Sequence, residues 1–289
     1  MEVVDARTTD DVVDADRYPL AEPDGPELRA VVARVRRELR TTGCSVLRDF
    51  VRPELRDVLR DESDEVAPLA HYAVQTVNVY NTAPDPTLPG DHPACVAVER
   101  GNAFVARDLL PPRYLLQRLY RGPDFQRFVA ACVGLPAVHE LRDPLSGLCV
   151  NVVDPGRSHP WHFDTNDVTV SMLTRAPEAG GIFEYCPGIR SAADERFADV
   201  RAVLDGDGEH LIRRLTLRPG DLQLFAGRYA LHRVTAVEGA GARHSAIFAY
   251  SERPGVVGSL ERTRQLFGRT TPVHEAAAAR AVRIDGLLD

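Results

Sequence analysis

The chain has 289 residues, of which 44% are hydrophobic, and its formal net charge is −7 without a long basic stripe. A chain of this length can bury a large core as one domain, since β-barrel enzymes often run past about 200 residues undivided. The acidic balance argues against nucleic acid as a partner, because it would repel phosphate groups.

The first half of the chain is predicted to be mainly helical. Residues 1–25 are acidic and polar, and we expect them to pack loosely. Hydrophobic spacing and turn residues predict, in order, a helix at 26–40, a strand at 44–50, a helix from 53, a strand at 72–80 and helices at 112–120 and 123–133. Four prolines within residues 81–101 disfavour a regular element there and predict a long loop, which includes Arg100.

The second half, from Gly147 onward, is predicted to be mainly β-structure. The expected strands are 148–153, 168–173, one after Gly180-Gly181, one that follows the turn at 219–221 and leads to 232, and 246–250. Helices are expected at 194–204, 259–267 and 273–282. Together these elements predict one α+β domain over residues 1–289, with a β-barrel centre and helical supports.

The cysteines and the hydropathy pattern favour a cytoplasmic location. Five cysteines are scattered without close pairing in a chain too large to need disulfides, which favours reduced thiols in a cytoplasm. The first residues show neither a basic start nor an apolar signal region, and no apolar run approaches bilayer-spanning length. We therefore expect a cytoplasmic protein without a membrane partner.

His162 and Asp164 form the first part of a candidate metal site. Side chains two apart on an extended segment point the same way, so both can reach one metal ion. Alone, a His-x-Asp pair is weak evidence in a chain with nine histidines. His232 ends a strand, turn and strand pattern far downstream and can supply the third ligand. Two imidazoles and one carboxylate suit iron(II) with one open face, whereas structural zinc normally takes thiolates or four closed ligands.

The ordered set His162-x-Asp164, His232 and Arg243-x-Ser245 resembles the iron(II)/2-oxoglutarate-dependent oxygenases. Within that superfamily, the chain is more similar to a bacterial group that includes radical halogenases of free amino acids and their hydroxylating relatives. The matching segments are 88–93, 159–166, 180–185 and 219–235. The resemblance implies a double-stranded β-helix, or jelly roll, with flanking helices and a metal-binding core at 147–252. It also implies iron(II), 2-oxoglutarate and dioxygen as cofactors, with the two histidines and Asp164 as the catalytic metal ligands.

One departure from the halogenases concerns the reaction. The halogenases carry a small residue where this chain has Asp164, which leaves an iron site for chloride. A carboxylate at this position fills that site, so the resemblance implies hydroxylation of an unactivated C–H bond in a free amino acid or a similar small metabolite. The alternatives are a desaturase or cyclase in natural-product biosynthesis, and a catalytically silent jelly roll that acts as a sensor or scaffold.

Arg243 is our candidate for the distal carboxylate of 2-oxoglutarate. Its guanidinium presents a planar fork that matches a carboxylate with two parallel hydrogen bonds. Ser245 lies two residues further along the same strand and can donate a third hydrogen bond. The alternative for Arg243 is a solvated surface position, and Arg228 and Arg233 are the competing anchors.

Three further residues are candidate substrate contacts. His159 stands three residues before the first ligand and can contact substrate or orient a ligand, since ligand histidines need a partner for their other nitrogen. Its alternative is an exposed loop histidine. Thr165 can face the substrate, or have its hydroxyl satisfied by backbone. Arg100 is assigned to a substrate carboxylate by analogy with the amino-acid-specific relatives, against the alternative of a surface salt bridge.

Overall fold

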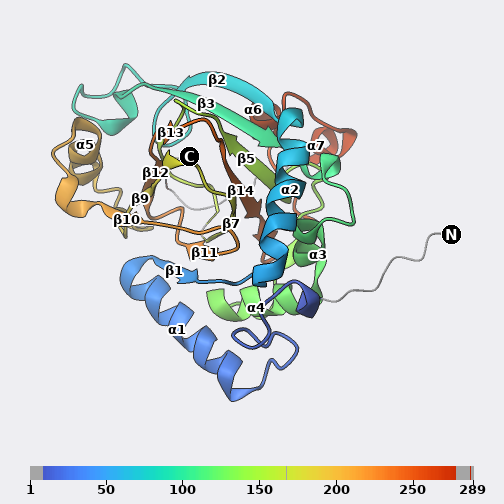
Figure 1. Cartoon of the computed structure of the whole chain (residues 1–289). Coiled ribbons are helices and arrows are strands. Elements are labelled where there is room, and N and C mark those ends of the chain that lie inside the picture. Colours follow the sequence, from blue (N-terminus) through green and yellow to red (C-terminus); the bar gives the residue numbers. More distant parts are fainter. Residues whose placement is uncertain (1–8, 167, 278–286, 288–289) are drawn as a thin grey trace.

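The computed structural model describes residues 9–166, 168–277 and 287, and within them helices surround two antiparallel sheets (Figure 1). The helices are α1 (Pro26–Thr42), α2 (Arg56–Val66), α3 (Leu115–Arg121), α4 (Pro123–Val133), α5 (Phe197–Asp205), α6 (Leu260–Phe267) and α7 (Pro272–Ala277). Mixed helices and antiparallel sheets agree with the expected α+β class.

A seven-stranded sheet forms one wall of the centre. Its strands, in spatial order, are β1 (Cys44–Leu47), β11 (Leu222–Phe225), β7 (Thr169–Arg175), β14 (Arg243–Phe248), β5 (Leu148–Val153), β3 (Val98–Val105) and β2 (His71–Val77). Neighbouring strands pair antiparallel throughout this sheet. The sheet therefore joins segments from both halves of the chain.

A four-stranded sheet forms the opposite wall. Its order is β10 (Arg213–Leu215), β9 (Phe183–Cys186), β12 (Leu231–Val234) and β6 (His159–His162). Two short pairs, β8 (Ala179–Gly180) with β13 (Val237–Glu238) and β4 (His139–Glu140) with β15 (Tyr250–Ser251), lie beside the large sheets. Phe183 of the small sheet packs against Phe225 of the large sheet, with ring centroids 5.1 Å apart. The inner faces of the two sheets therefore meet in a shared core.

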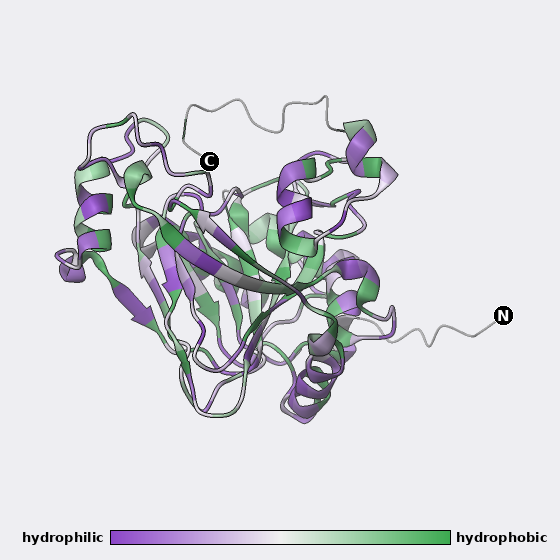
Figure 2. Cartoon of the chain, turned by 90° about the horizontal axis from the view of Figure 1, so that it is seen from above, coloured by the Kyte–Doolittle hydropathy of each residue, from purple (hydrophilic) through white to green (hydrophobic). Residues whose placement is uncertain are grey.

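Several helices cover the outside of this centre and bury an apolar face against it. Helix α1 begins at Pro26 and is capped after Thr42 by Gly43, whose backbone adopts the left-handed conformation. It buries Leu28 and Val35. Helices α1 and α4 lie below the sheets in Figure 1, and α2 crosses beside them. The helices viewed from above carry both hydrophilic and hydrophobic turns (Figure 2), as expected for elements with one solvated face.

The described part of the N-terminal segment does not pack loosely. Val12, Val13, Tyr18 and Leu20 are buried in the main hydrophobic cluster, and Tyr18 contacts the ring of Phe50 with a centroid distance of 5.2 Å. The expectation for residues 1–25 is therefore wrong for this part, because its large apolar side chains are buried in the core. Residues 1–8 lie outside the described residues.

The predicted loop at 81–101 is wrong in its last part. Strand β3 begins at Val98 and pairs with β2 over its whole length and with β5 at its end. The prolines stop at Pro93, so nothing disfavours a strand after them. The predicted helix at 273–282 is confirmed only over Pro272–Ala277, and the remainder of that range lies outside the described residues.

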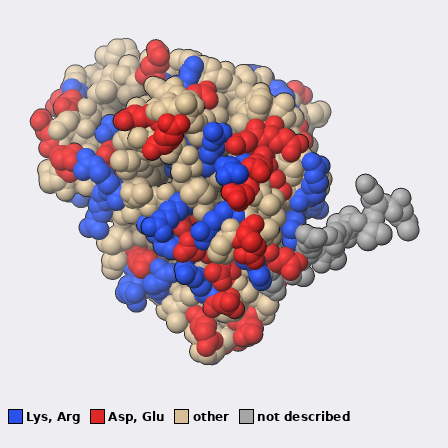
Figure 3. Space-filling view, in the orientation of Figure 1, with Lys and Arg blue, Asp and Glu red and all other residues tan. Residues whose placement is uncertain are grey.

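The surface carries charges of both signs. On the face seen in Figure 3, Arg side chains are interspersed with Asp and Glu side chains. Many of these groups form exposed ion pairs, such as Arg60 with Asp57 at 2.8 Å. None of the helices in the described residues has the length and apolar character of a membrane-spanning segment.

Candidate metal centre

The two candidate histidine ligands are direct neighbours across the small sheet. His162 is the last residue of β6, His232 lies in β12, and the register pairs these two residues with each other. Their ring centroids are 4.1 Å apart, and both side chains are buried. Antiparallel pairing places opposite side chains on the same face, so the sheet itself brings the two imidazoles together.

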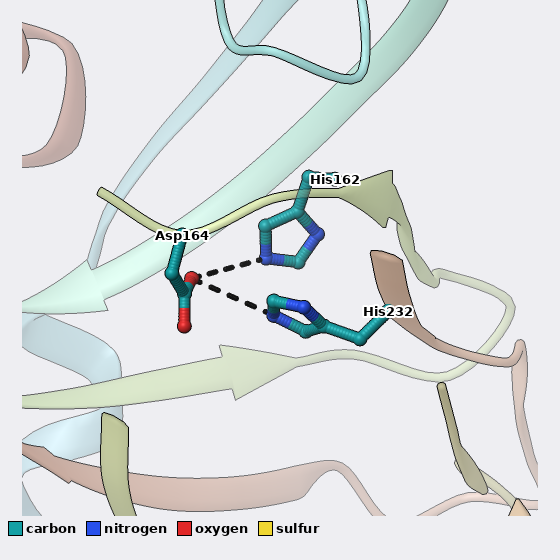
Figure 4. Close-up of side chains that lie close together, drawn as sticks. All are labelled: His162, Asp164 and His232. Carbon is teal, nitrogen blue, oxygen red and sulfur yellow. Dashed lines mark ion pairs between the residues drawn. The ribbon is translucent and has the colours of Figure 1, made fainter. Parts of the chain in front are cut away.

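Asp164 completes the cluster from the segment that follows β6. Its Oδ1 lies 3.7 Å from Nε2 of His162 and 3.5 Å from Nε2 of His232 (Figure 4). The three ligand atoms lie within 4.8 Å of one another. The structure thus brings together all three residues that the sequence predicts as metal ligands, and one ion can contact them all.

Backbone carbonyls fix the orientation of both rings. Nδ1 of His162 lies 2.8 Å from the carbonyl oxygen of Pro160, and Nδ1 of His232 lies 2.9 Å from that of Ala230. A carbonyl only accepts, so Nδ1 carries the proton and Nε2 has a free lone pair. Burial lowers the pKa of His162 well below its usual value, which keeps this imidazole neutral. Neutral imidazoles with exposed Nε2 lone pairs are the form that binds a metal ion.

Asp164 is held in place by Thr169 through its second oxygen and by Gly227 through the backbone, where the Asp164 N–H donates to the Gly227 carbonyl at 3.1 Å. The Thr169 hydroxyl donates a hydrogen bond to Oδ2. Gly227 lies directly behind the carboxylate, where a Cβ atom would be 2.3 Å from Oδ2. Burial opposes ionisation of Asp164, but a second proton on His232 or His162, when present, and the hydrogen bond from Thr169 hold the pKa of the carboxyl below its usual range. The carboxylate is therefore ionised and directed at the histidines.

The three candidate ligands line a cavity between the two sheets. Arg243 lines this cavity from the opposite sheet. It is the first residue of β14, is 5% exposed, and lines the cavity together with His162, Asp164 and His232. Its Nη1 donates a hydrogen bond to the hydroxyl oxygen of Ser245, which also lines the cavity. Burial lowers the pKa of Arg243 to about 10, so the guanidinium remains charged at neutral pH. The surface alternative for Arg243 is wrong, because the side chain is buried beside the cluster.

Neither competing arginine lines this cavity among the described residues. Arg233 forms an ion pair of 2.6 Å with Glu184 and lies over the Trp161 ring at 4.6 Å from its centroid. Strand alternation turns Arg233 away from the ligand His232, as expected. Arg228 is fully buried in the turn before β12. Arg243 therefore has the best position for an anion beside the cluster.

His159 stacks on the first ligand instead of bonding to it. The rings of His159 and His162 are nearly parallel at 7°, with centroids 4.1 Å apart. Nε2 of His159 is buried and has no hydrogen-bond partner among the described residues. A buried polar atom without a partner is unfavourable, so this nitrogen is free to bond to a molecule in the cavity. The exposed-loop alternative for His159 is wrong, because the residue begins strand β6.

The other two predicted substrate contacts differ in their surroundings. Thr165 is exposed and lines the cavity directly after Asp164. Arg100 is only 2% exposed and donates hydrogen bonds to Asn81 and Gln75, which both line the cavity. No carboxylate pairs with Arg100 among the described residues, so the alternative of a surface salt bridge is wrong.

Three residues at this site are absent from the sequence prediction. Thr169 and Gly227 support the carboxylate of Asp164, and Arg262 of helix α6 lines the cavity. A threonine at a strand start, a glycine in a turn and an arginine in an amphipathic helix are all common. No local signal distinguishes them, because their roles depend on contacts with distant segments.

Comparison with known proteins supports the same superfamily. The family model described as Halogenase D matches residues 99–264, which include all three cluster residues and Arg243. No curated protein is significantly similar to the chain.

Solved structures share the fold at low sequence identity. A prolyl hydroxylase from Trichoplax adhaerens, in complex with a hypoxia inducible factor peptide, is 14% identical with a TM-score of 0.52, covering 83% of this chain and 94% of the other. AviO1 from Streptomyces viridochromogenes Tue57 is 17% identical with a TM-score of 0.51, covering 78% and 96%. The epimerase SnoN, in complex with Fe3+, alpha ketoglutarate and nogalamycin RO, is 16% identical with a TM-score of 0.50, covering 77% and 84%.

Proposed function

The chain belongs to the Halogenase D family, and we propose that it hydroxylates an unactivated C–H bond of a free amino acid or a similar small metabolite. It is a 2-oxoglutarate-dependent non-haem iron enzyme whose cofactors are iron(II), 2-oxoglutarate and dioxygen. When bound, iron(II) and 2-oxoglutarate supply the oxidising power, and the protein supplies binding and orientation.

The carboxylate at position 164 is the observation that carries this proposal. In the related halogenases a small residue at this position leaves room for chloride on iron. Here the Asp164 carboxylate lies 3.5 to 3.7 Å from both imidazoles, where Thr169 donates a hydrogen bond to it and Gly227 leaves the space that it occupies. An ionised carboxylate in this position would occupy the site that chloride needs. Transfer of oxygen, rather than chlorine, is therefore the expected outcome.

The remaining polar groups of the cavity bind the cosubstrate or the substrate in this proposal. Arg243 binds the distal carboxylate of 2-oxoglutarate with its planar fork. Ser245 accepts a hydrogen bond from Arg243, which leaves its own hydroxyl proton free to donate to the same carboxylate. His159, with its free Nε2 beside the ligand His162, contacts the substrate or the cosubstrate.

The fold proposal follows from the two sheets. We assign the seven-stranded and four-stranded sheets to a double-stranded β-helix whose two walls enclose the metal site, within a single domain that spans the chain. The ligands come from the small sheet and Arg243 comes from the large sheet, so the cavity between the walls is where iron and 2-oxoglutarate would meet. A role in natural-product biosynthesis and a cytoplasmic location stay predictions.

Release of succinate tests the proposed reaction. The iron-loaded protein is incubated in air with 2-oxoglutarate and each member of an amino-acid panel, and the products are analysed by mass. Succinate formed in step with a product that has gained one oxygen atom supports hydroxylation. Loss of a hydrogen pair identifies a desaturase or cyclase instead, and chlorine incorporation from added chloride contradicts the proposed role of Asp164.

The variant Asp164→Gly gives the matched test of the key residue. It should lose hydroxylation, because one of three metal ligands is removed, and the opened position should allow chloride to bind. Asp207→Gly is the control, since Asp207 is exposed in the turn after helix α5. Full hydroxylating activity in Asp164→Gly would show that Asp164 is not a ligand.

A further inference from the structure

The cavity beside the metal centre is lined by Arg262 as well as by Arg243 and the exposed Arg142 and Arg253. The buried Arg100 of strand β3 lies directly behind its wall, because it donates hydrogen bonds to Asn81 and Gln75, which line it. Arg262 belongs to helix α6, which packs against β2 and β3 (Figure 1). Neither Arg100 nor Arg262 has a place in binding iron, and Arg243 already has the position for 2-oxoglutarate. Their presence therefore needs a separate explanation.

Arg100 is a buried cation with neutral partners. Its guanidinium donates to the side-chain oxygens of Asn81 and Gln75, and its side chain is almost completely removed from solvent. Burial, with the nearby charge of Arg262, lowers the pKa of Arg100 to about 9. Asn81 and Gln75 orient the guanidinium but do not neutralise it.

Arg262 is half-buried on helix α6, which packs against the strand that carries Arg100. Its Nη1 donates to the amide oxygen of Gln265 at 3.3 Å, and both side chains line the cavity. Burial lowers its pKa, although the charge of Asp164 opposes this shift. Arg262, Arg243 and the two partners of Arg100, Asn81 and Gln75, line the same cavity as His159, so the three cations lie at or directly behind one cavity wall.

Arg190, another buried arginine of this chain, has a carboxylate partner. It is 1% exposed and forms an ion pair of 3.0 Å with Glu195. Burying a charge without a counter-ion is unfavourable, so such pairing is the usual solution. Arg100 differs, because no carboxylate pairs with it among the described residues and its two hydrogen-bond partners line the cavity.

The charges of the described cavity wall do not balance. The carboxylates that line it are Asp164 and the exposed Glu252 and Glu261, and two exposed arginines, Arg142 and Arg253, line it as well. In the proposed function, Asp164 binds iron and 2-oxoglutarate neutralises Arg243. The charges of Arg100 and Arg262 then remain, and no buried carboxylate among the described residues is free to bind the side-chain ammonium of a cationic amino acid.

We propose that Arg100 and Arg262 form an anion-binding subsite, and that the substrate is a small molecule with two negatively charged groups. An acidic amino acid and a phosphorylated amino acid share this chemistry. The inference rests on the proposed function, because it assigns Arg243 to 2-oxoglutarate. It excludes cationic amino acids such as lysine as preferred substrates, and it predicts that uncharged side chains bind weakly.

Binding measured without turnover tests the subsite. The protein with iron(II) and saturating 2-oxoglutarate is titrated in a calorimeter in the absence of dioxygen. The probes are L-aspartate, L-glutamate and O-phospho-L-serine, with L-leucine and L-lysine for comparison. At least one acidic probe should bind about tenfold or more tightly than leucine and lysine, and the dicarboxylates and the phosphate ester distinguish the two sources of charge.

Arg262→Gln tests the assignment to a residue. It should weaken binding of the preferred acidic probe about 30-fold, while leucine binding changes by less than about threefold and 2-oxoglutarate binding is retained. Arg264→Gln is the matched control, because Arg264 is exposed on the same helix and does not line the cavity; it should match the unmodified protein. Arg100→Lys, which retains the charge but loses the fork, should weaken the same probe.

Several results would overturn the inference. One is that every acidic probe binds no more tightly than leucine and lysine. Another is that Arg262→Gln weakens the binding of all probes equally. A third is that this variant no longer binds 2-oxoglutarate. The proposed function fails separately: an acidic probe that binds through Arg262 but releases no succinate and yields no product in air leaves the subsite intact and contradicts the hydroxylase. Succinate release with leucine or lysine alone supports the reaction and contradicts the subsite.

Discussion

Gly227→Ala should displace the Asp164 carboxylate without replacing any of the proposed metal ligands. A Cβ at position 227 would lie 2.3 Å from Oδ2 of Asp164 and 2.9 Å from its Cγ, whereas ordinary contacts begin at 3.4 Å. The carboxylate must therefore move by about 1 Å, a shift that can cost about 100-fold when groups have to be aligned. Gly227 has no positive φ angle, so alanine brings steric overlap but no backbone strain.

The effect is measurable in two assays. Iron(II) affinity, determined by competition with a chelator, should fall about 10- to 100-fold, as expected when the support of a metal ligand is lost. The free energy of unfolding of the metal-free protein should fall by about 1–3 kcal/mol, the usual cost of overpacking. Gly90→Ala is the control, because a Cβ there meets no atom within 4 Å, and it should leave both quantities unchanged.

A double-mutant cycle isolates the contact. In the background of Asp164→Gly the carboxylate is absent, so Gly227→Ala should cost much less unfolding free energy than in the unmodified protein. The difference should be about 0.5–3 kcal/mol, as for residues in direct contact. An equal loss in both backgrounds, or equal iron affinity of Gly227→Ala and Gly90→Ala, would refute the reasoning.

Three further predictions concern residues around the cluster. Arg243→Ala should raise the 2-oxoglutarate concentration required for succinate release, since a lost buried charge-assisted contact costs about 2–5 kcal/mol; an unchanged requirement would move the anchor elsewhere. Thr169→Val should weaken iron(II) affinity about tenfold in the same chelator assay while 2-oxoglutarate binding to the iron-saturated protein is retained, because Asp164 Oδ2 loses its donor; equal iron affinity would exclude a positioning role. Burial, opposed by Asp64, lowers the pKa of His244 from 6.5 to about 4, so its contribution to stability is present above pH 6.5 and is lost as the pH falls toward 4, by about 3 kcal/mol at most. His244→Asn should flatten the dependence of Tm on pH over this range, and an unchanged slope would contradict the assignment.

The metal cluster could be predicted from the sequence because its signal is local. His162 and Asp164 are two residues apart, and His232 follows a recognisable strand and turn pattern. Residues two apart on an extended segment point the same way, whatever the fold of the remaining chain. The direct pairing of His162 with His232 across β6 and β12, which makes them neighbours, could not be predicted, because strand register depends on the packing of both sheets.

The residues that support the cluster and the arginines around it could be identified only from the tertiary structure. Arg100 lies in strand β3, a segment for which the four prolines before it predict a loop. Arg262 lies on helix α6, whose hydrophobic spacing predicts an apolar and a polar face but no contact with a cavity. Thr169 and Gly227 have no local feature that marks them.

By itself, the sequence determined the class of site, because residue type and spacing decide which chemistry a segment can support. Only the tertiary structure decided which groups orient the carboxylate of Asp164 and which cations face the cavity. The physical reason is that burial, hydrogen-bond partners and charge balance arise from segments that are distant in the chain and meet only in the folded state.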